Sequence, residues 1–260
     1  MNSTLEILQH RRSTRNFSDQ PLAAEEKDAI LQAAFRAPTA GNMMLYSIIE
    51  VDDQALKDRL VDTCDHQPFI AKAPFVLLFL ADYQRWFDYF RLCEAERKAD
   101  ELGLPNRLPQ EGDLLLACCD ALIAAQTAVI AAESMGIGSC YIGDILENYE
   151  IHREMFDLPK YVLPVSLLLF GRPASGEMPA RRTPRFAPEF ILHRNRYRRF
   201  EPEAFERMYA HLNERLLAMP KRPFDAENAG QATYLRKFVS DFSVEMSRSA
   251  REMIKNWQGK

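Results

Sequence analysis

The stretch that most constrains the fold of this 260-residue chain runs from Asp113 to Gly143. Between Asp113 and Met135 nearly every residue is Ala, Leu, Ile, Val or Cys. Polar residues recur at every seventh position, which places them on one narrow stripe of a helix: Asp113, Asp120, Thr127 and Ser134. Such a helix must be covered on several sides. It ends at Gly136, and a short β-rich piece follows, from Ser139 to Ile142.

A helix of this kind is the axis of the fold, a subunit interface or a membrane span. The span is disfavoured, because Asp120 and Glu133 lie within or near its middle. Each charge there would cost roughly 2.5–3.5 kcal/mol in lipid. The N-terminus has no apolar stretch followed by a small-residue cleavage site, so no signal peptide is expected. We expect no membrane association.

Composition narrows the class further. The chain is 47% hydrophobic and 27% charged, as in folded globular proteins. Its net charge of −4 offers no general attraction to nucleic acid, so we expect no nucleic-acid partner. The five cysteines contain no CxxC pair, which argues against a disulfide scaffold or a metal site. The cysteines also favour a reducing, cytoplasmic location.

Hydrophobic periodicity predicts alternating strands and helices, and hence an α+β or α/β fold. The predicted strands are 45–51, 75–82, 139–142 and 162–170. The predicted helices are 4–11 (with a Ser3/Glu6 capping box), 24–37, 53–64, 113–135, 148–156, 201–219 and 229–257. The charged, aromatic stretch 83–102 reads as a surface helix or lid. No GxGxxG, P-loop, HExxH or GxSxG motif is present.

Two clusters of arginines are candidates for chemistry. Residues 11–15 read Arg-Arg-Ser-Thr-Arg, directly after a short predicted helix. Guanidinium groups and hydroxyls suit a phosphate monoester, which accepts charge-assisted and often bidentate hydrogen bonds. The second cluster, residues 181–185, lies in a proline-rich loop. Taken alone, either cluster is more often a solvated charged surface.

With these motifs in view, the sequence resembles the FMN-dependent nitroreductase family, in its larger, C-terminally extended branch of NAD(P)H-dependent nitroreductases and flavin reductases. Six pieces carry the resemblance, in the family's order and over about the first 200 residues. They are RRSTRNFSDQPL at 11–22, APTAGN at 37–42, HQPFIAKAP at 66–74, MGIGSCYIGDI at 135–145, LLLFGRPA at 167–174 and PRFAPEFILHRNRY at 184–197.

The resemblance implies an α+β fold with a central, mixed but mostly antiparallel sheet of four or five strands flanked by helices. It also implies a homodimer of the domain-swapped type, with one FMN at each of two sites in the interface. Residues 1–200 would form the FMN-binding domain. Residues 201–260 would be a helical extension that packs on the dimer and is not an independent domain.

The same resemblance assigns cofactor-binding residues one by one. Arg11, Arg12 and Ser13 would meet the FMN phosphate, with Arg185 as its second clamp. Arg15 would reach the polar edge of the isoalloxazine ring, where a cation tunes the flavin. Gln67 would contact the ring or ribityl chain from the same subunit, with Phe69 nearby. Three residues after the central helix would pass over the ring: Tyr141, Ile142 and Gly143. The other subunit would contribute Pro38, Thr39, Ala40 and Asn42.

Some residues depart from the family pattern. Arg11 stands where this branch often has histidine, and Thr183 stands where many members have lysine. Met43 to Tyr46 replace a Gln-Pro-Trp-like sequence, which predicts a more apolar substrate pocket. His66 and His193 could serve the site or be solvated, and the aromatic residues from Trp86 to Phe90 could form a lid or a surface helix. Arg194, Arg196, Arg198 and Arg199 favour NADPH over NADH, because a 2′-phosphate needs cations.

The expected activity is an FMN-dependent oxidoreductase that takes hydride from NADPH or NADH and reduces nitroaromatics, quinones or flavins by a ping-pong mechanism. The cofactor carries the chemistry, so no catalytic side chain is assigned. One alternative is a flavin reductase that supplies reduced FMN to a partner. A second is a non-catalytic flavin-binding protein, and a third is an interaction module whose arginines bind phosphoproteins.

Overall fold

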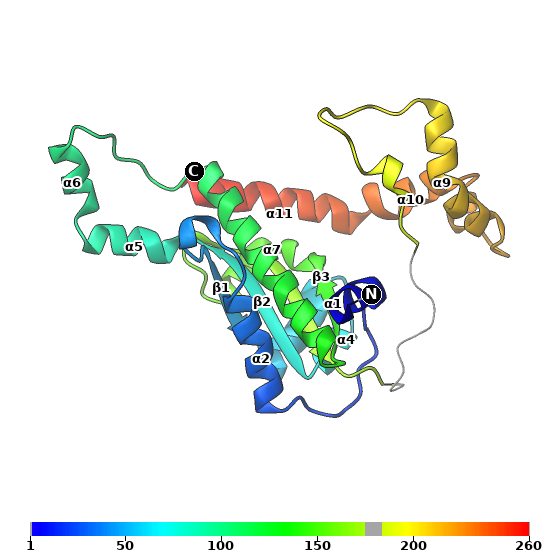
Figure 1. The fold of residues 1–260 in the computed structure, drawn as a ribbon, viewed down its shortest axis with the longest axis horizontal. Helices are drawn as coiled ribbons and strands as arrows, with labels where there is room; N and C mark the ends of the chain where they lie inside the picture. Colours follow the sequence, from blue (N-terminus) through cyan, green and yellow to red (C-terminus); the bar gives the residue numbers. More distant parts are fainter. Residues whose placement is uncertain (1, 175–183, 260) are drawn as a thin grey trace. The chain divides into compact units, whose positions relative to one another are not determined.

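The computed structural model describes residues 2–174 and 184–259, which form two compact units (Figure 1). The first unit comprises Met1–Ala180 with Glu245–Lys260, and the second comprises Arg181–Val244. Arg181, Arg182 and Thr183 lie outside the described residues. The predicted division of the chain into 1–200 and 201–260 stays a prediction.

A four-stranded sheet forms the centre of the first unit. Its strands are β1 (Tyr46–Glu50), β2 (Phe75–Asp82), β3 (Gly138–Ile142) and β4 (Val162–Gly171), each within two residues of its predicted range. The strand order is β1-β2-β4-β3, and every pair is antiparallel. A single parallel bridge, between Ser13 and Ser139, adds the mixed character. β1 and β3 are therefore the two edges of the sheet.

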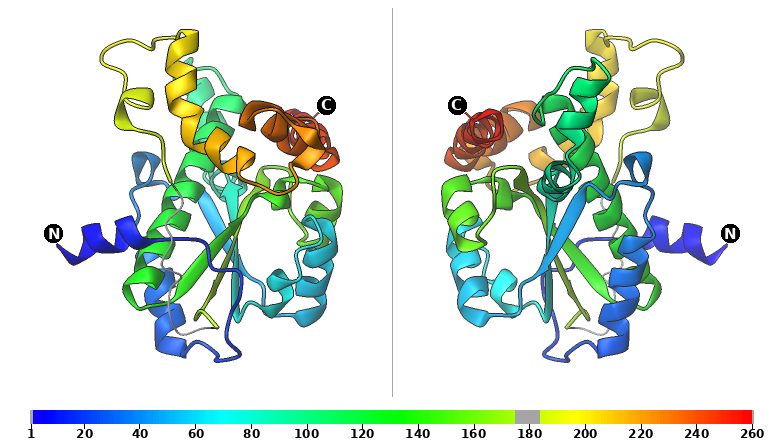
Figure 2. Two further views of the ribbon diagram at one scale, coloured as in Figure 1. Left: turned by 90° about the vertical axis from the view of Figure 1, so that its right-hand side faces the viewer. Right: turned by 90° about the vertical axis from the view of Figure 1, so that its left-hand side faces the viewer.

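Helices cover both faces of this sheet (Figure 2). The eight residues of β2 are all buried, and they alternate between two hydrophobic layers because strand side chains point to opposite faces. Phe75, Leu77 and Phe79 pack in the layer of α2 (Ala24–Phe35) and α7 (Glu111–Ser134). Val76, Leu78 and Leu80 pack in the layer of α3 (Gln54–Thr63) and α4 (Phe69–Lys72).

The apolar central helix is confirmed as α7, within two residues of its predicted start and one of its end. It is long and apolar enough to cross a membrane by length and composition. In this fold it lies against the sheet as a core helix, with a row of fully buried small residues: Ala117, Ala121, Ala124, Ala125 and Ala128. Small side chains let the helix axis approach the strands closely.

One face of α7 is nevertheless apolar and uncovered in the single chain. Leu115 is 67% exposed, Leu116 50%, Leu122 46% and Ile123 40%. Cys119 lies exposed between them. Four large apolar side chains on one helix face, left in water, are typical of a surface that another protein covers.

The remaining helices of the first unit follow the predicted pattern closely. They are α1 (Ser3–His10), α5 (Gln84–Leu92), α6 (Ala95–Glu101) and α8 (Tyr149–Met155). The predicted Ser3 cap of α1 is wrong. The helix begins one residue earlier, and Asn2 is the N-cap, its side chain accepting a hydrogen bond from the backbone N–H of Leu5 at 3.0 Å.

The C-terminal helix α11 (Asp241–Gln258) packs back on the sheet unit. Trp257 is 1% exposed and stacks edge-on against Tyr161, and its indole N–H donates to the carbonyl of Gln110 at 3.1 Å. The prediction of one continuous helix over 229–257 is wrong. Ser240 interrupts it, since its carbonyl accepts the first hydrogen bonds of α11 and its hydroxyl turns back to Lys237.

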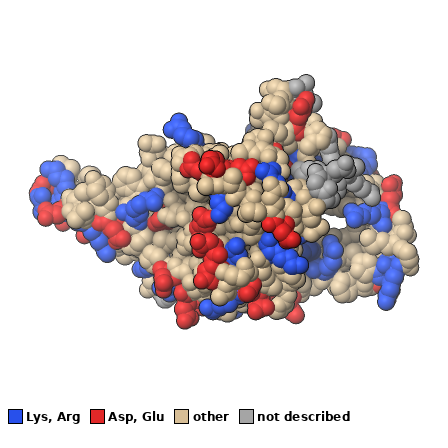
Figure 3. All heavy atoms as spheres, turned by 90° about the horizontal axis from the view of Figure 1, so that it is seen from below, with Lys and Arg blue, Asp and Glu red and all other residues tan. Residues whose placement is uncertain are grey.

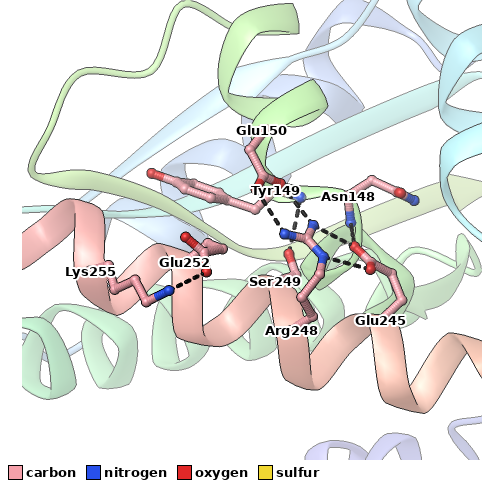
Figure 4. A network of polar contacts seen from close by, with 8 residues as sticks. All are labelled: Asn148, Tyr149, Glu150, Glu245, Arg248, Ser249, Glu252 and Lys255. Carbon is pink, nitrogen blue, oxygen red and sulfur yellow. Dashed lines mark hydrogen bonds and ion pairs between the residues drawn. The ribbon is translucent and has the colours of Figure 1, made fainter. Parts of the chain in front are cut away.

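A network of charges fastens α11 to α8 (Figure 4). The guanidinium of Arg248 contacts both carboxylate oxygens of Glu150 at 2.8 Å and those of Glu245 at 2.7–2.8 Å. Glu245 also accepts from the backbone N–H of Asn148, and the buried Ser249 hydroxyl accepts from that of Tyr149. Hydrogen bonds from Arg248 lower the pKa of Glu150 to about 2 and also lower the pKa of Glu245.

We expect Arg248→Met to remove part of the protein's sensitivity to acid. A carboxyl whose pKa falls on folding stabilises the protein above its unfolded pKa, and this contribution is lost as pH drops towards 2. The melting temperature of the native protein should therefore fall more steeply below about pH 4.5 than that of the variant. Lys255→Met, which removes a cation paired only within α11, is the control. Parallel melting curves for native protein and Arg248→Met would refute the role of the network.

The second unit consists of helical segments: α9 (Pro202–Leu217), α10 (Ala229–Thr233) and a π-helical turn at Tyr234–Phe238. Its apolar contacts are modest. Leu216, Ala226 and Ala232 form a small buried cluster. Phe186 packs edge-on against Tyr209, and Phe190 against Phe200.

Candidate functional site

The basic turn at residues 11–15 runs along the free edge of β3. Ser13 forms a parallel bridge with Ser139, and the backbone N–H of Thr14 donates to the carbonyl of Ser139 at 2.8 Å. Thr14 packs so closely that a Cβ at Gly138 would lie 2.2 Å from its hydroxyl. Only glycine allows this approach, so Gly138, the first residue of β3, lets the basic turn pack against the strand.

The first two arginines of the turn have buried nitrogen atoms without partners. Arg11 Nη1 and Arg12 Nε are inaccessible to solvent, and within the described residues neither makes a hydrogen bond. Their charges act on Glu133, whose pKa is raised by burial and pulled back by Ser139, Arg11 and Arg12. Buried donors are almost always paired in native proteins. These two nitrogen atoms are therefore candidates to donate hydrogen bonds to a bound anion.

Ser13 and Arg15 lie beside the same strand. Burial raises the pKa of the Cys140 thiol, while the charge of Arg15 and a hydrogen bond from Ser13 oppose the shift. Both residues are exposed. Cys140 itself is 1% exposed and packs in the core.

Gly143, the residue after β3, has no neighbouring atoms where a side chain would lie. Ile142 is 1% exposed with its side chain in the core, so only its backbone can face a ligand. The Tyr141 hydroxyl donates to Gln126 of α7 at 3.3 Å, and burial raises its pKa to about 12. A Cβ at Gly143 would meet no atom within 4 Å. The chain's own packing does not fill the space beside Gly143.

Gln67 reaches the same end of β3 from the other helical layer. Its side-chain amide nitrogen donates to the carboxylate of Asp144 at 2.7 Å and to the carbonyl of Cys64 at 3.0 Å. Phe69 is half-buried and packs against the α3–α4 layer. His66 is solvated, with 82% of its side chain exposed and a 3.8 Å contact to Asp62.

The segment 38–42 lies at the opposite edge of the sheet, before β1. Three strand spacings separate β1 from β3, or about 14 Å at ~4.8 Å each. The buried Asp120 of α7 organises this segment: it accepts hydrogen bonds from the Thr39 hydroxyl and from the backbone N–H groups of Ala40 (2.9 Å) and Leu45 (3.1 Å). Pro38 and Asn42 are exposed beside it. One chain does not bring this segment to the basic turn.

A cavity of about 640 Å³ opens next to this segment. Its wall is mainly apolar and aromatic, and it includes Met43, Met44, Trp86, Tyr89 and Phe35. The start of α5 holds the wall in place, because the Trp86 indole donates to the Met43 carbonyl at 2.6 Å and Arg85 donates to the Tyr46 carbonyl at 3.2 Å. The replaced sequence at 43–46 and the aromatic stretch 86–90 thus line one cavity.

The second unit carries the remaining predicted cations. Arg185 lies there, at its N-terminal end. A separate cavity of about 530 Å³ is lined by His193, Arg194, Arg198, Arg199 and Arg207, together with Glu189, Glu201 and Glu203. Arg196 does not line it.

Charges of both signs are interspersed over the face of the molecule in Figure 3. Arg11 and Arg12 are distinguished by one side-chain nitrogen atom each that is buried and has no hydrogen-bond partner among the described residues.

Sequence reasoning missed four residues. Asp120 appeared only as part of a polar stripe, yet its position every seventh residue on an otherwise apolar helix marked it as a buried acceptor. Asp144 and Glu147 follow the glycine at 143, but nothing in their spacing indicated burial. Arg85 lay within the aromatic stretch without a motif.

Known proteins share the sequence and the fold of this chain. The model of the nitroreductase family matches residues 8–172. The chain is 34% identical to an oxygen-insensitive NADPH nitroreductase of Salmonella typhimurium, covering 83% of this chain and 82% of the relative. It is 36% identical to an FMN reductase (NADPH) of Bacillus subtilis, covering 76% and 75%. The solved structure of NfrA2 from B. megaterium superposes with a TM-score of 0.74 at 27% identity, covering 96% and 98%.

Proposed function

The chain belongs to the nitroreductase family, and on that premise we propose that it is an FMN-dependent oxidoreductase that uses NADPH or NADH to reduce small electron acceptors. The acceptors are nitroaromatics, quinones or flavins, as the relatives named NADPH nitroreductase and FMN reductase suggest. When bound, FMN accepts hydride from the nicotinamide and passes the electrons on.

One observation carries the proposal. Arg11 Nη1 and Arg12 Nε are buried without hydrogen-bond partners, on the same strand edge where a side chain at Gly143 would meet nothing. These two nitrogen atoms can donate to the phosphate of FMN, and Gly143, which has no side chain, lets a flat ring approach the backbone. Ser13 would bind the phosphate, and Arg15 would supply a positive charge at the polar edge of the ring. The backbone of Tyr141 and Ile142 would face the ring, and Gln67 would contact the ring or the ribityl chain.

The rest of the site belongs to a second copy of the chain. Pro38, Thr39, Ala40 and Asn42 are held at the edge of the sheet opposite the basic turn, so they reach a cofactor only from a partner subunit. The apolar, uncovered face of α7 offers the contact surface for a homodimer. In such a dimer the cavity beside Met43 and Trp86 would receive the electron acceptor.

We expect Ile123→Glu to dissociate the dimer and to lower FMN affinity with it. Ile123 is 40% exposed on the uncovered face of α7, so a charge there leaves the single chain intact but must be desolvated in an interface. Ile151, also 40% exposed but on α8, provides the matched control Ile151→Glu. Analytical ultracentrifugation and FMN titration report the result. An Ile123→Glu protein that stays dimeric, or that is monomeric with unchanged FMN affinity, would contradict the assignment.

We also propose Arg185 as a ligand of the FMN phosphate, and the arginine-lined cavity as the site of the 2′-phosphate of NADPH. Steady-state kinetics with NADPH and a nitroaromatic or quinone test the activity, and parallel double-reciprocal lines are expected for a ping-pong mechanism. A chain that supplies free reduced flavin is the second candidate, favoured by the relative named FMN reductase. It would lose FMN on gel filtration and turn over added FMN. We place the protein in the cytoplasm.

A further inference from the structure

Gln67 is locked in one orientation by two acceptors. Its amide nitrogen carries two protons, and the carboxylate of Asp144 (2.7 Å) and the carbonyl of Cys64 (3.0 Å) accept them both. The Cys64 carbonyl cannot donate, so turning the amide around would break this hydrogen bond. Within the described residues, no hydrogen bond engages the Gln67 carbonyl oxygen. The side chain can therefore offer a ligand only an acceptor.

A second carboxyl group, that of Glu147, lies three residues after Asp144. Glu147 closes the short helical turn Gly143–Leu146, with its backbone N–H donating to the Asp144 carbonyl at 3.0 Å. Its side chain is 5% exposed, and its Oε1 is buried without a hydrogen-bond partner. Besides burial, the charge of Asp144 and hydrogen bonding to its carboxyl group raise the pKa of Glu147.

The groups that face Glu147 favour its protonated form. Burial raises its pKa to about 8, and the carboxylates of Asp144, Asp65 and Glu245 add to the shift. The other two neighbours are neutral at physiological pH: burial raises the pKa of the Cys64 thiol to about 12 and lowers that of the His152 imidazole to about 4. These five neighbours supply no positive charge.

From these contacts we propose that Asp144 and Glu147 share one proton and together act as positioning residues for the flavin, fixing Gln67 so that its carbonyl oxygen accepts a hydrogen bond from the cofactor. This rests on the proposed function. Donors of the matching kind on FMN are the ring N3–H and the ribityl hydroxyls. Loss of the shared proton places two adjacent carboxylates together, pushes Asp144 away from Glu147 and releases Gln67.

The first test measures FMN affinity of the FMN-free protein by fluorescence quenching at about pH 7 and about pH 9.5. The native protein should bind roughly five- to tenfold more weakly at the higher pH, the effect of one lost hydrogen bond. Glu147→Gln cannot ionise and should change by less than about twofold, while sharing every titration of FMN itself. Gln67→Leu should bind weakly at both pH values, with no step between them.

If FMN affinity of Glu147→Gln fell between the two pH values as much as that of the native protein, the inference would be overturned. The same fall in Gln67→Leu would also overturn it, because the charge of Glu147 would then act on FMN binding without Gln67. A native protein that binds FMN without a pH step refutes the inference alone. A native protein that binds no FMN at either pH refutes the proposed function.

A second measurement needs no cofactor. The pKa of Glu147 rises on folding from 4.5 to about 8, so stability is full below the unfolded value and is lost as pH rises through this window. The melting temperature of the native protein should therefore fall relative to that of Glu147→Gln between about pH 5 and about pH 8.5. Parallel melting curves would show that Glu147 holds no such proton.

Discussion

Replacing Arg11 with methionine should weaken FMN binding by about 10- to 100-fold without destabilising the FMN-free protein. A hydrogen bond to a charged group contributes roughly 1.5–3 kcal/mol, and each ~1.4 kcal/mol is a factor of ten in affinity. In the FMN-free protein Arg11 Nη1 has no hydrogen-bond partner among the described residues, so the substitution breaks no hydrogen bond of this atom. Methionine keeps the apolar stem and removes the charge.

The two readouts separate a ligand site from a structural role. An arginine that held the fold together would lose stability when replaced, whereas a cofactor-binding arginine should lose affinity alone. Arg36→Met removes the same charge from an exposed position after α2 and is the control. The assignment fails if Arg11→Met binds FMN as tightly as Arg36→Met, or if its melting temperature drops while affinity is kept. Arg11→Ala with Arg185→Ala should bind weaker still.

Asp120→Ala should have the largest effect on stability, about 2–4 kcal/mol. Asp120 is 2% exposed and accepts three hydrogen bonds, and its removal leaves the backbone N–H groups of Ala40 and Leu45 unpaired. Each unsatisfied buried donor costs roughly 1–3 kcal/mol. The segment 38–42 would also lose its fixed position, so FMN affinity should fall as well.

Urea unfolding measures this loss as a lower midpoint at an unchanged slope. Thr39→Val is the graded control, because it keeps Asp120 and removes only the hydroxyl, which donates to Asp120 and accepts from the backbone N–H of Met44; it should cost about 1–2 kcal/mol. Equal midpoints for Asp120→Ala and Thr39→Val would show that Asp120 does not organise the segment.

Much of the fold was predictable because its signals are local. The unbroken apolar run of β2 and the alanine-rich α7 both predict burial, and the structure buries all of β2 and the face of α7 that packs on the sheet. Prediction failed at helix ends, where neighbouring polar side chains compete to cap the helix. Asn2, and not Ser3, caps α1, and Ser240 ends one helix and begins another.

The candidate site was predictable as a set of motifs but not as an arrangement. RRSTR indicated an anion site, and the buried unpaired nitrogens of Arg11 and Arg12 agree with it. The Thr39 hydroxyl donates to Asp120, 81 residues away, and this contact depends on how α7 crosses the sheet. The burial of Glu147 likewise depends on three segments meeting, which no spacing along the chain encodes.

The central claim is that this chain holds FMN and reduces it with a nicotinamide dinucleotide. An absorption spectrum of the purified protein, followed by anaerobic titration with NADPH and then with NADH, tests it most directly. The account predicts a yellow protein, or one that becomes yellow on adding FMN, whose flavin bands bleach with about one equivalent of dinucleotide. A colourless protein without affinity for FMN, or bound flavin that neither dinucleotide bleaches, would contradict it.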